Sequence, residues 1–134
     1  MATRVLIADD VADMRWLLRR VIEGSEDFEV VAEAGDGRAA IEQARVHRPD
    51  VIVLDLAMPR MDGLEALPFL HSASPGVRVL VLTSIEHPKI VERALSSCAS
   101  RFLTKGTSGA EIIRTLTEVA ASPPKNGCAA QEGA

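Results

Sequence analysis

Several residue types are scarce in this chain, and each scarcity excludes a class of protein. The 134 residues include two cysteines, Cys98 and Cys128, which lie far apart and fit no metal-binding spacing. The three histidines are scattered, so no Cys/His cluster predicts a zinc site. We therefore expect both cysteines to be ordinary reduced thiols.

Long hydrophobic runs and a leader sequence are also missing. No apolar stretch approaches the roughly 20 residues that span a bilayer. The chain passes from Met1-Ala2-Thr3-Arg4 straight into a strand-like run, without the apolar segment and cleavage site of a signal peptide. Its net charge of -4 disfavours direct nucleic-acid binding, which needs a clustered basic surface. We expect a cytoplasmic protein that contacts neither membrane nor nucleic acid directly.

Five short apolar runs alternate with stretches of helical periodicity. The runs that predict strands are Arg4–Ala8, Phe28–Ala34, Val51–Leu54, Val77–Thr83 and Arg101–Thr104. The predicted helices are Val11–Glu23, Arg38–His47, Gly63–His71, Pro88–Ser97 and Ser108–Ala121. Strict alternation with short connections predicts a doubly wound α/β fold, in which helices cover both faces of a parallel sheet.

Two details of the pattern concern the helices and the end of the chain. The first predicted helix should bury Leu17 and Leu18, and Trp16 falls off its apolar face. The last should begin with Ser108 as its N-cap. The domain is expected to cover residues 1–121, and the segment 122–134, rich in Pro, Gly and Ala, should be a disordered tail or linker.

Polar side chains follow four of the five predicted strands. Asp9 and Asp10 follow the first strand, Asp55 follows the third, Thr83 ends the fourth, and Lys105 follows the fifth. Parallel sheets place their sites beyond the carboxyl ends of the strands. These residues are therefore the candidates for chemistry.

The joint occurrence of three carboxylates is the informative feature. Any single Asp at such a junction is often only a helix N-cap. Three together repel one another unless a cation compensates. Their charge of -3 is offset by +1 from Lys105 and +2 from a divalent ion, and oxygen ligands of this kind suit Mg²⁺. A carboxylate beside Mg²⁺ can attack phosphorus to form an aspartyl phosphate.

Over residues 3–121 the chain resembles the receiver domains of two-component response regulators. The resemblance rests on VLIADD (Val5–Asp10), VIVLDLAMPRMDG (Val51–Gly63), VLVLTS (Val79–Ser84) and RFLTKG (Arg101–Gly106). The segment VLDLAMPRMDGLEAL looks most like the nitrate-regulator/LuxR-type branch. The resemblance implies a flavodoxin-like fold, with five strands in the order 2-1-3-4-5 and five helices.

The resemblance also implies the metal and phosphoryl ligands. Asp55 matches the phosphoacceptor. Asp10, Asp55 and the backbone carbonyl of Ala57 would bind Mg²⁺ directly, and Asp9 would act mainly through a bound water. Lys105 matches the lysine that pairs with the phosphoryl oxygens.

A switch and its partners are implied in the same way. Thr83 matches the switch hydroxyl, and Phe102 matches the aromatic residue that changes rotamer with it; the fourth helix, fifth strand and fifth helix would report the change. The phosphodonor would be a histidine kinase or a histidine phosphotransfer protein. Phosphorylation could also produce a homodimer.

Two departures from the family pattern carry consequences. Cys98 stands where receivers usually have a glycine after the fourth helix, so a positive φ would strain it. Ala57 and Ile85 flank the site and cannot orient a hydrolytic water by hydrogen bonding. We therefore hypothesise slow self-dephosphorylation in a protein that is not a turnover enzyme.

Several functions remain open at this point. The chain could be a stand-alone receiver that acts by protein contact, or the N-terminal receiver of a LuxR-type transcription regulator. A Mg²⁺-dependent phosphohydrolase of the haloacid dehalogenase type would need an Asp where Ala57 stands. An FMN binder is disfavoured because Asp9 and Asp10 would repel a phosphate, and no Gly-rich phosphate loop is present.

Overall fold

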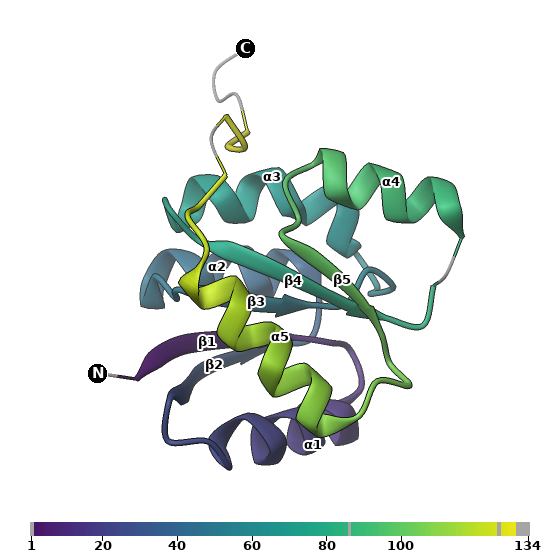
Figure 1. The fold of residues 1–134 in the computed structure, drawn as a ribbon. Coiled ribbons are helices and arrows are strands. Elements are labelled where there is room, and N and C mark those ends of the chain that lie inside the picture. Colours follow the sequence, from purple (N-terminus) through teal and green to yellow (C-terminus); the bar gives the residue numbers. More distant parts are fainter. Residues whose placement is uncertain (1, 86, 126, 131–134) are drawn as a thin grey trace.

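The computed structural model describes residues 2–85, 87–125 and 127–130, and these form five parallel strands joined by helices (Figure 1). The strands are β1 (Thr3–Ala8), β2 (Phe28–Ala34), β3 (Val51–Leu54), β4 (Arg78–Thr83) and β5 (Arg101–Thr104). The helices are α1 (Ala12–Glu23), α2 (Gly37–His47), α3 (Gly63–Ala73), α4 (Pro88–Ser96) and α5 (Gly109–Ala121). All five strands predicted from the sequence are confirmed, and each end lies within one residue of its predicted position.

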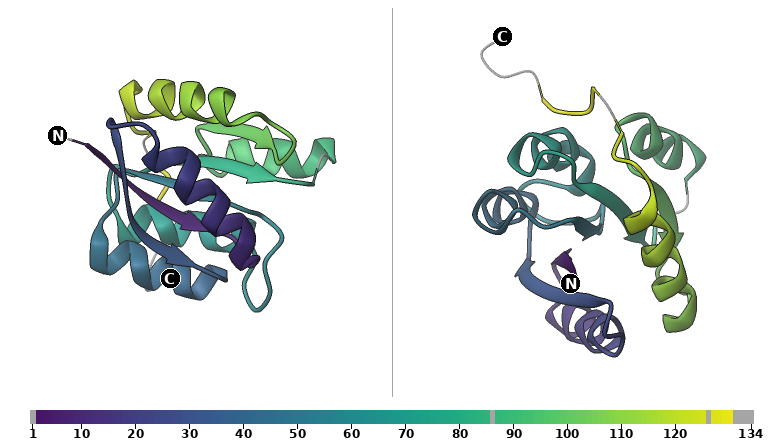
Figure 2. Two further views of the ribbon diagram at one scale, coloured as in Figure 1. Left: turned by 90° about the horizontal axis from the view of Figure 1, so that it is seen from below. Right: turned by 60° about the vertical axis from the view of Figure 1, so that its left-hand side comes forward.

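The strands pair in the order β2-β1-β3-β4-β5, which confirms the predicted topology. All four pairings are parallel, and β3 pairs with both β1 and β4 at the centre of the sheet. Helices α1 and α5 cover one face, and α2, α3 and α4 cover the other (Figure 2). The carboxyl ends of the strands consequently lie at one common edge.

Alternating strand residues supply two separate cores. Val5 and Ile7 point toward the side of α1 and α5, whereas Leu6 and Ala8 point toward α2 and α3. Strand β3 is buried along its whole length, as a strand covered on both faces should be.

Helix termini agree with the sequence in most cases. Ser108 caps α5 by accepting a hydrogen bond from the amide of Glu111, as predicted.

The predicted burial of Leu17 is wrong, because this side chain is 49% exposed. Leu18 and Ile22, one turn apart, face the sheet, and Leu17 lies about 100° around the helix from Leu18, on the solvent side.

The two cysteines correct a further expectation. Cys98 and Cys128 form a disulfide and are not reduced thiols. Cys98 has a φ of 75°, so the anticipated left-handed conformation is present. Because Cys has a Cβ, this conformation costs about 1–2 kcal/mol more than it would for glycine.

The described residues of the predicted tail lie against the domain. Ser122 accepts a hydrogen bond from Arg78 Nε at 2.9 Å, and the disulfide fixes Cys128. The division into a domain of residues 1–121 and a disordered tail or linker stays a prediction. Among the described residues, no helix has the length and apolar character needed to cross a membrane.

Candidate functional site

The acidic residues predicted from the sequence come together at the carboxyl edge of the sheet. Asp9 follows β1 and Asp55 follows β3, and both carboxylates are almost fully buried, at 1% and 3% exposure. Asp10 is exposed beside them. One carboxylate oxygen from each of the three residues lies within 4.8 Å of the others. Such a group of hard oxygen ligands fits a divalent cation such as Mg²⁺.

Lys105, directly after β5, pairs with both buried carboxylates. Its ammonium lies 2.8 Å from Asp9 Oδ2 and 2.9 Å from Asp55 Oδ2. The three carboxylates and Lys105 sum to a charge of -2, which a divalent cation would neutralise. The other oxygens of the two buried carboxylates accept backbone hydrogen bonds, Asp9 Oδ1 from Val11 and Asp55 Oδ1 from Ala57.

The pKa of Lys105 reflects this environment. Burial lowers it, but hydrogen bonds to Asp9 and Asp55, together with the charges of these carboxylates, outweigh burial and raise the pKa above its ordinary value of 10.5. The ammonium is therefore charged at neutral pH. A raised pKa in the folded state means that the pairing stabilises the fold fully below pH 10.5 and loses this effect as the pH rises through the folded-state pKa.

Lys105→Met is expected to flatten the alkaline part of the stability curve. The chain has no tyrosine and its cysteines are paired, so neither a phenol nor a thiol titrates in this range. The free energy of unfolding, measured by urea denaturation from about pH 9.5 to about pH 11.5, should fall more steeply in wild type than in Lys105→Met. Lys89→Met, at an exposed position on α4, is the matched control and should keep the wild-type slope. Equal slopes in wild type and Lys105→Met would contradict the pairing.

The loop that follows Asp55 is held by close backbone packing. A Cβ on Gly63 would lie 2.9 Å from Leu56 Cα and closer still to the Asp55 carbonyl oxygen, so only glycine fits. Gly63 also donates its amide to the Leu56 carbonyl at 3.0 Å. The close packing against Asp55 and Leu56 gives a physical reason for glycine at position 63.

Two arginines that support the site could not be recognised in the sequence. Arg15 on α1 donates from Nη1 to the Asp9 backbone carbonyl at 2.7 Å. Arg60, in the loop after β3, donates from Nε to Asp36 Oδ2 at 2.7 Å and so ties this loop to the N-terminus of α2. Residues 36 and 60 are far apart along the chain, and no spacing or motif signals such a contact.

Thr83 and Phe102 lie on the same face of the sheet. Thr83 ends β4 and is fully buried, with its hydroxyl oxygen accepting the amide of Ile85 at 3.4 Å. Phe102 pairs with Val81 in the register of β4 and β5, and is half-buried against the core on the α4 side. Since Val81 and Thr83 are two residues apart, their side chains share a face, and Phe102 is a diagonal neighbour of Thr83.

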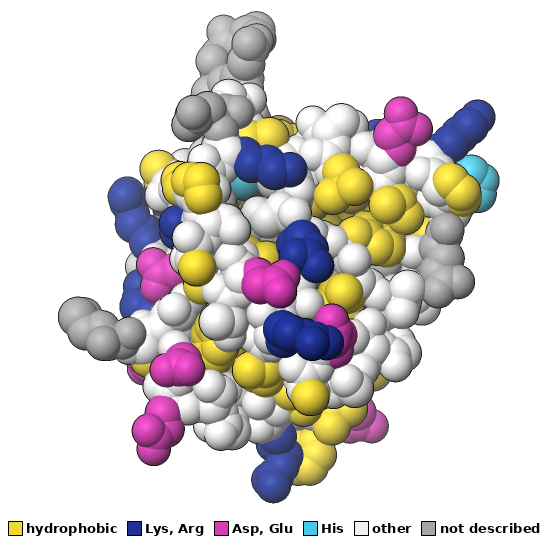
Figure 3. All heavy atoms as spheres, in the orientation of Figure 1, with side chains coloured by type: hydrophobic (Ala, Val, Ile, Leu, Met, Phe, Trp, Pro, Cys, Tyr) yellow, Lys and Arg dark blue, Asp and Glu magenta, His cyan; other side chains and the backbone are white. Residues whose placement is uncertain are grey.

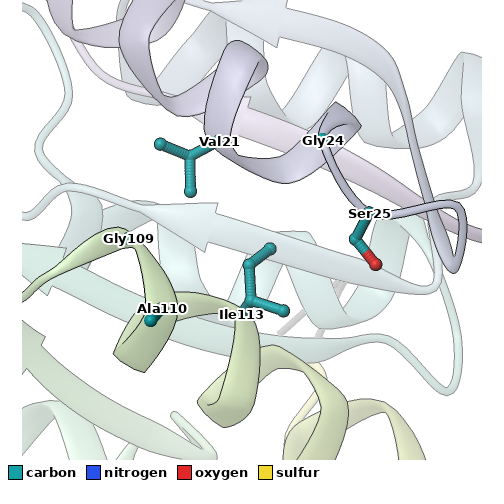
Figure 4. A pocket seen from close by; sticks show the side chains of 6 residues that line it. All are labelled: Val21, Gly24, Ser25, Gly109, Ala110 and Ile113. Atoms are coloured by element: carbon teal, nitrogen blue, oxygen red, sulfur yellow. The ribbon is translucent and has the colours of Figure 1, made fainter.

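A separate pocket of about 450 Å³ lies between α1 and α5 (Figure 4). Val21 and Ile113 face each other across it, and none of its lining residues belongs to the predicted site. We assign the chemistry to the strand ends, because the pocket offers no charged side chain. The residues that line it are Val21, Gly24, Ser25, Gly109, Ala110 and Ile113.

Fold and site together define a doubly wound α/β protein with an acidic, lysine-paired site at the carboxyl edge of its sheet. Residues 5–117 match the response regulator receiver domain family. The chain belongs to this family of two-component signalling proteins.

Individual relatives agree with this assignment. The chain is 31% identical over 119 residues to the chemotaxis protein CheY of Thermotoga maritima, covering 89% of this chain and 98% of CheY. It is 40% identical over 111 residues to a protein-glutamate methylesterase/protein-glutamine glutaminase of Azospirillum brasilense, covering 81% of this chain but spanning only 28% of that protein.

A solved structure supports the branch resemblance. The signal receiver domain of the response regulator NarL from Mycobacterium tuberculosis superposes with a TM-score of 0.84 at 36% identity. The match covers 89% of this chain and 96% of the NarL domain. The flavodoxin-like receiver fold expected from the sequence is confirmed.

Proposed function

We propose that this chain is a phosphorylation switch that accepts a phosphoryl group on Asp55. The observation that carries the proposal is the buried Asp55 carboxylate, held by Lys105 within a cluster of three acids. A carboxylate oxygen of Asp55 attacks phosphorus, the bond from phosphorus to the donor nitrogen breaks, and the departing imidazole takes up a proton. The donor is a histidine kinase or a histidine phosphotransfer protein in the cytoplasm.

Each neighbouring residue has a task in this reaction. Asp10, Asp55 and the Ala57 carbonyl would hold Mg²⁺ directly, and Asp9 through a water. Bound Mg²⁺ would supply positive charge to the transferring phosphoryl group. Lys105 already lies against Asp55 and would follow the phosphoryl oxygens, offsetting their charge.

The switch proceeds from the phosphoryl group to the surface. The phosphoryl oxygens attract the Thr83 hydroxyl, and the Phe102 side chain then turns inward. The hydroxyl contact contributes only about 1–3 kcal/mol, so the inactive and active states must lie close in energy.

Hydrophobic side chains gather over α4 and β5 (Figure 3), where Leu95 is 40% exposed. This face would present the output or a homodimer contact.

Mass spectrometry of the intact protein tests the proposed reaction. Incubation with Mg²⁺ and acetyl phosphate, a small phosphodonor, should add one phosphoryl group, and EDTA should prevent the addition. Absence of both an adduct and Mg²⁺ binding would overturn the proposal.

Two outputs are compatible with this chemistry. Similarity over nearly the whole length of CheY is compatible with a stand-alone receiver that acts by protein contact. The similarity to the receiver of a LuxR-family DNA-binding response regulator from Staphylococcus aureus, at 28% identity, is compatible with the N-terminal part of a transcription regulator. Sequencing the native gene beyond codon 134 separates the two.

The phosphoryl group on Asp55 should be long-lived. Ala57 is exposed at the site and Ile85 is partly exposed, and neither side chain can orient an attacking water. We expect the adduct to decay over minutes or longer after the phosphodonor is removed, as followed by intact mass. A half-life of seconds would contradict this reading of the two positions.

Trp16 is the proposed contact for the phosphodonor protein. The ring is 60% exposed on α1, the helix that begins beside Asp10, and the Arg20 guanidinium lies 5.1 Å from its centroid. Trp16→Ala should slow transfer from a phosphohistidine protein by about tenfold, because exposed aromatic residues dominate many interfaces. The rate with acetyl phosphate and the melting temperature should not change. Val46→Ala, at an equally exposed position on α2, should leave transfer intact. If Trp16→Ala slowed phosphorylation by both the phosphohistidine protein and acetyl phosphate, Trp16 would have a structural role instead.

A further inference from the structure

The disulfide joins two regions that the proposed phosphoryl reaction does not use. Cys98 lies in the connection between α4 and β5, and Cys128 lies in the segment after α5, 30 residues away. In Figure 1 this segment passes from the end of α5 toward α3, away from the carboxyl ends of the strands. The disulfide is therefore remote from Asp55 along the sheet.

Hydrogen bonds on both sides of Cys128 hold the same segment. Lys125 Nζ donates to the Ala99 carbonyl at 2.9 Å. The Ala130 amide lies 2.9 Å from Ser72 Oγ and 3.0 Å from the Pro68 carbonyl, both on α3. Residues 125–130, apart from position 126, thus bridge α3 and the connection between α4 and β5. We refer to these residues as the strap.

The backbone at Cys98 is in the left-handed region, which glycine adopts more easily than cysteine. The amide of Cys98 donates to Leu95 and that of Ala99 to Ala94, an arrangement that ends helices and places the residue after the cap in the left-handed region. His71 Nε2 lies 3.2 Å from the Cys98 carbonyl and fixes the same turn from α3. Glycine would serve this turn without strain, so the backbone gives no reason for Cys.

The packing of the domain gives no reason for the disulfide either. Both cores are complete without Cys98 and Cys128, which belong to neither. A domain of this size has enough core to fold without a covalent cross-link. Both cysteines are partly exposed, so thiolates in solution can reach them. The proposed function places this chain in the cytoplasm, where disulfides are usually transient and catalytic or redox-sensing.

We propose that Cys98 and Cys128 form a reversible thiol–disulfide exchange site, whose oxidised form holds the strap across α3 and the connection between α4 and β5. A low-molecular-weight disulfide is the oxidant. One cysteine thiolate attacks it and releases the first small thiolate, and the second cysteine then displaces the other small thiolate from the mixed disulfide. The two cysteines lose two electrons and two protons in total, and the small disulfide is reduced to two thiols. A dithiol reverses the reaction.

Glutathione buffers test the exchange in the full chain. Samples equilibrated at different ratios of reduced to oxidised glutathione are quenched with iodoacetamide and weighed intact. We expect a single transition between a doubly alkylated and an unalkylated monomer. Asp55→Asn should give the same transition, since exchange does not depend on phosphorylation. Failure to form the intramolecular disulfide at any ratio, or formation of linked dimers in its place, would overturn the proposal.

Hydrogen exchange tests the strap itself. The Ala130 amide should exchange about tenfold faster, or more, after reduction, because its bonds to α3 then lack the covalent anchor. Trypsin should cut after Lys125 in both forms but release residues 126–134 only from the reduced one. Cys98→Gly, which relieves the left-handed strain, should fold and behave as the reduced form. Equal Ala130 exchange in oxidised protein, reduced protein and Cys98→Gly would show that the disulfide holds no strap.

Discussion

Asp55→Asn is expected to abolish the phosphoryl adduct that wild type forms with Mg²⁺ and acetyl phosphate. The amide is close to the carboxylate in shape and can still accept the Ala57 hydrogen bond that Asp55 Oδ1 accepts. Its nitrogen is not a nucleophile toward phosphorus, and its N–H group would face the Lys105 ammonium. Lys105 retains Asp9, so the fold should persist while the chemistry is lost.

Asp27→Asn is the matched control for this variant. It makes the same chemical change at an exposed position just before β2, at the opposite edge of the sheet. We expect full phosphorylation, by intact mass, in Asp27→Asn and none in Asp55→Asn. An adduct of wild-type yield in Asp55→Asn would place the phosphoacceptor elsewhere.

Gly63→Ala is expected to destabilise the domain and to impair the site at the same time. The new methyl group would overlap the backbone of Asp55 and Leu56, so the loop after β3 must move away from α3. Overpacking of this kind costs about 1–3 kcal/mol. The free energy of unfolding in urea should fall by that amount, and the rate of phosphorylation by acetyl phosphate should fall with it, because Asp55 is displaced.

Gly106→Ala provides the comparison for the stability measurement. A Cβ at Gly106 meets no atom within 4 Å, and its backbone does not need the left-handed region. Its free energy of unfolding should stay within about 0.5 kcal/mol of wild type. Similar losses in Gly63→Ala and Gly106→Ala would show that the contact with Asp55 is not the cause.

Much of the site could be predicted because parallel strands align their ends. Once five strands are recognised, Asp9, Asp55, Thr83 and Lys105 must meet at one edge, however far apart they lie in the sequence. The alternation of residues along β4 and β5 likewise places Thr83 and Phe102 on one face. The roles of these residues in metal binding and switching stay predictions.

Contacts that depend on the placement of loops could not be predicted. The bond between Arg60 and Asp36, and the packing of Gly37 against Met61, arise only when α2 lies beside the loop after β3. The pairing of Cys98 with Cys128 depends on the return of the chain toward α3 after α5. The hydrophobic periodicity of the sequence does not predict this path. The exposure of Leu17 depends on how α1 is rotated about its own axis against the sheet.

Chemical location of the phosphoryl group tests the central claim most directly. Borohydride reduces an aspartyl phosphate to homoserine, so wild type treated with Mg²⁺ and acetyl phosphate, reduced and digested, carries a mark at the phosphorylated residue. Peptide mass spectrometry should find homoserine at position 55 alone. Homoserine at Asp9 or Asp10, or a phosphoryl group on a residue that borohydride does not convert, would contradict the assignment of Asp55.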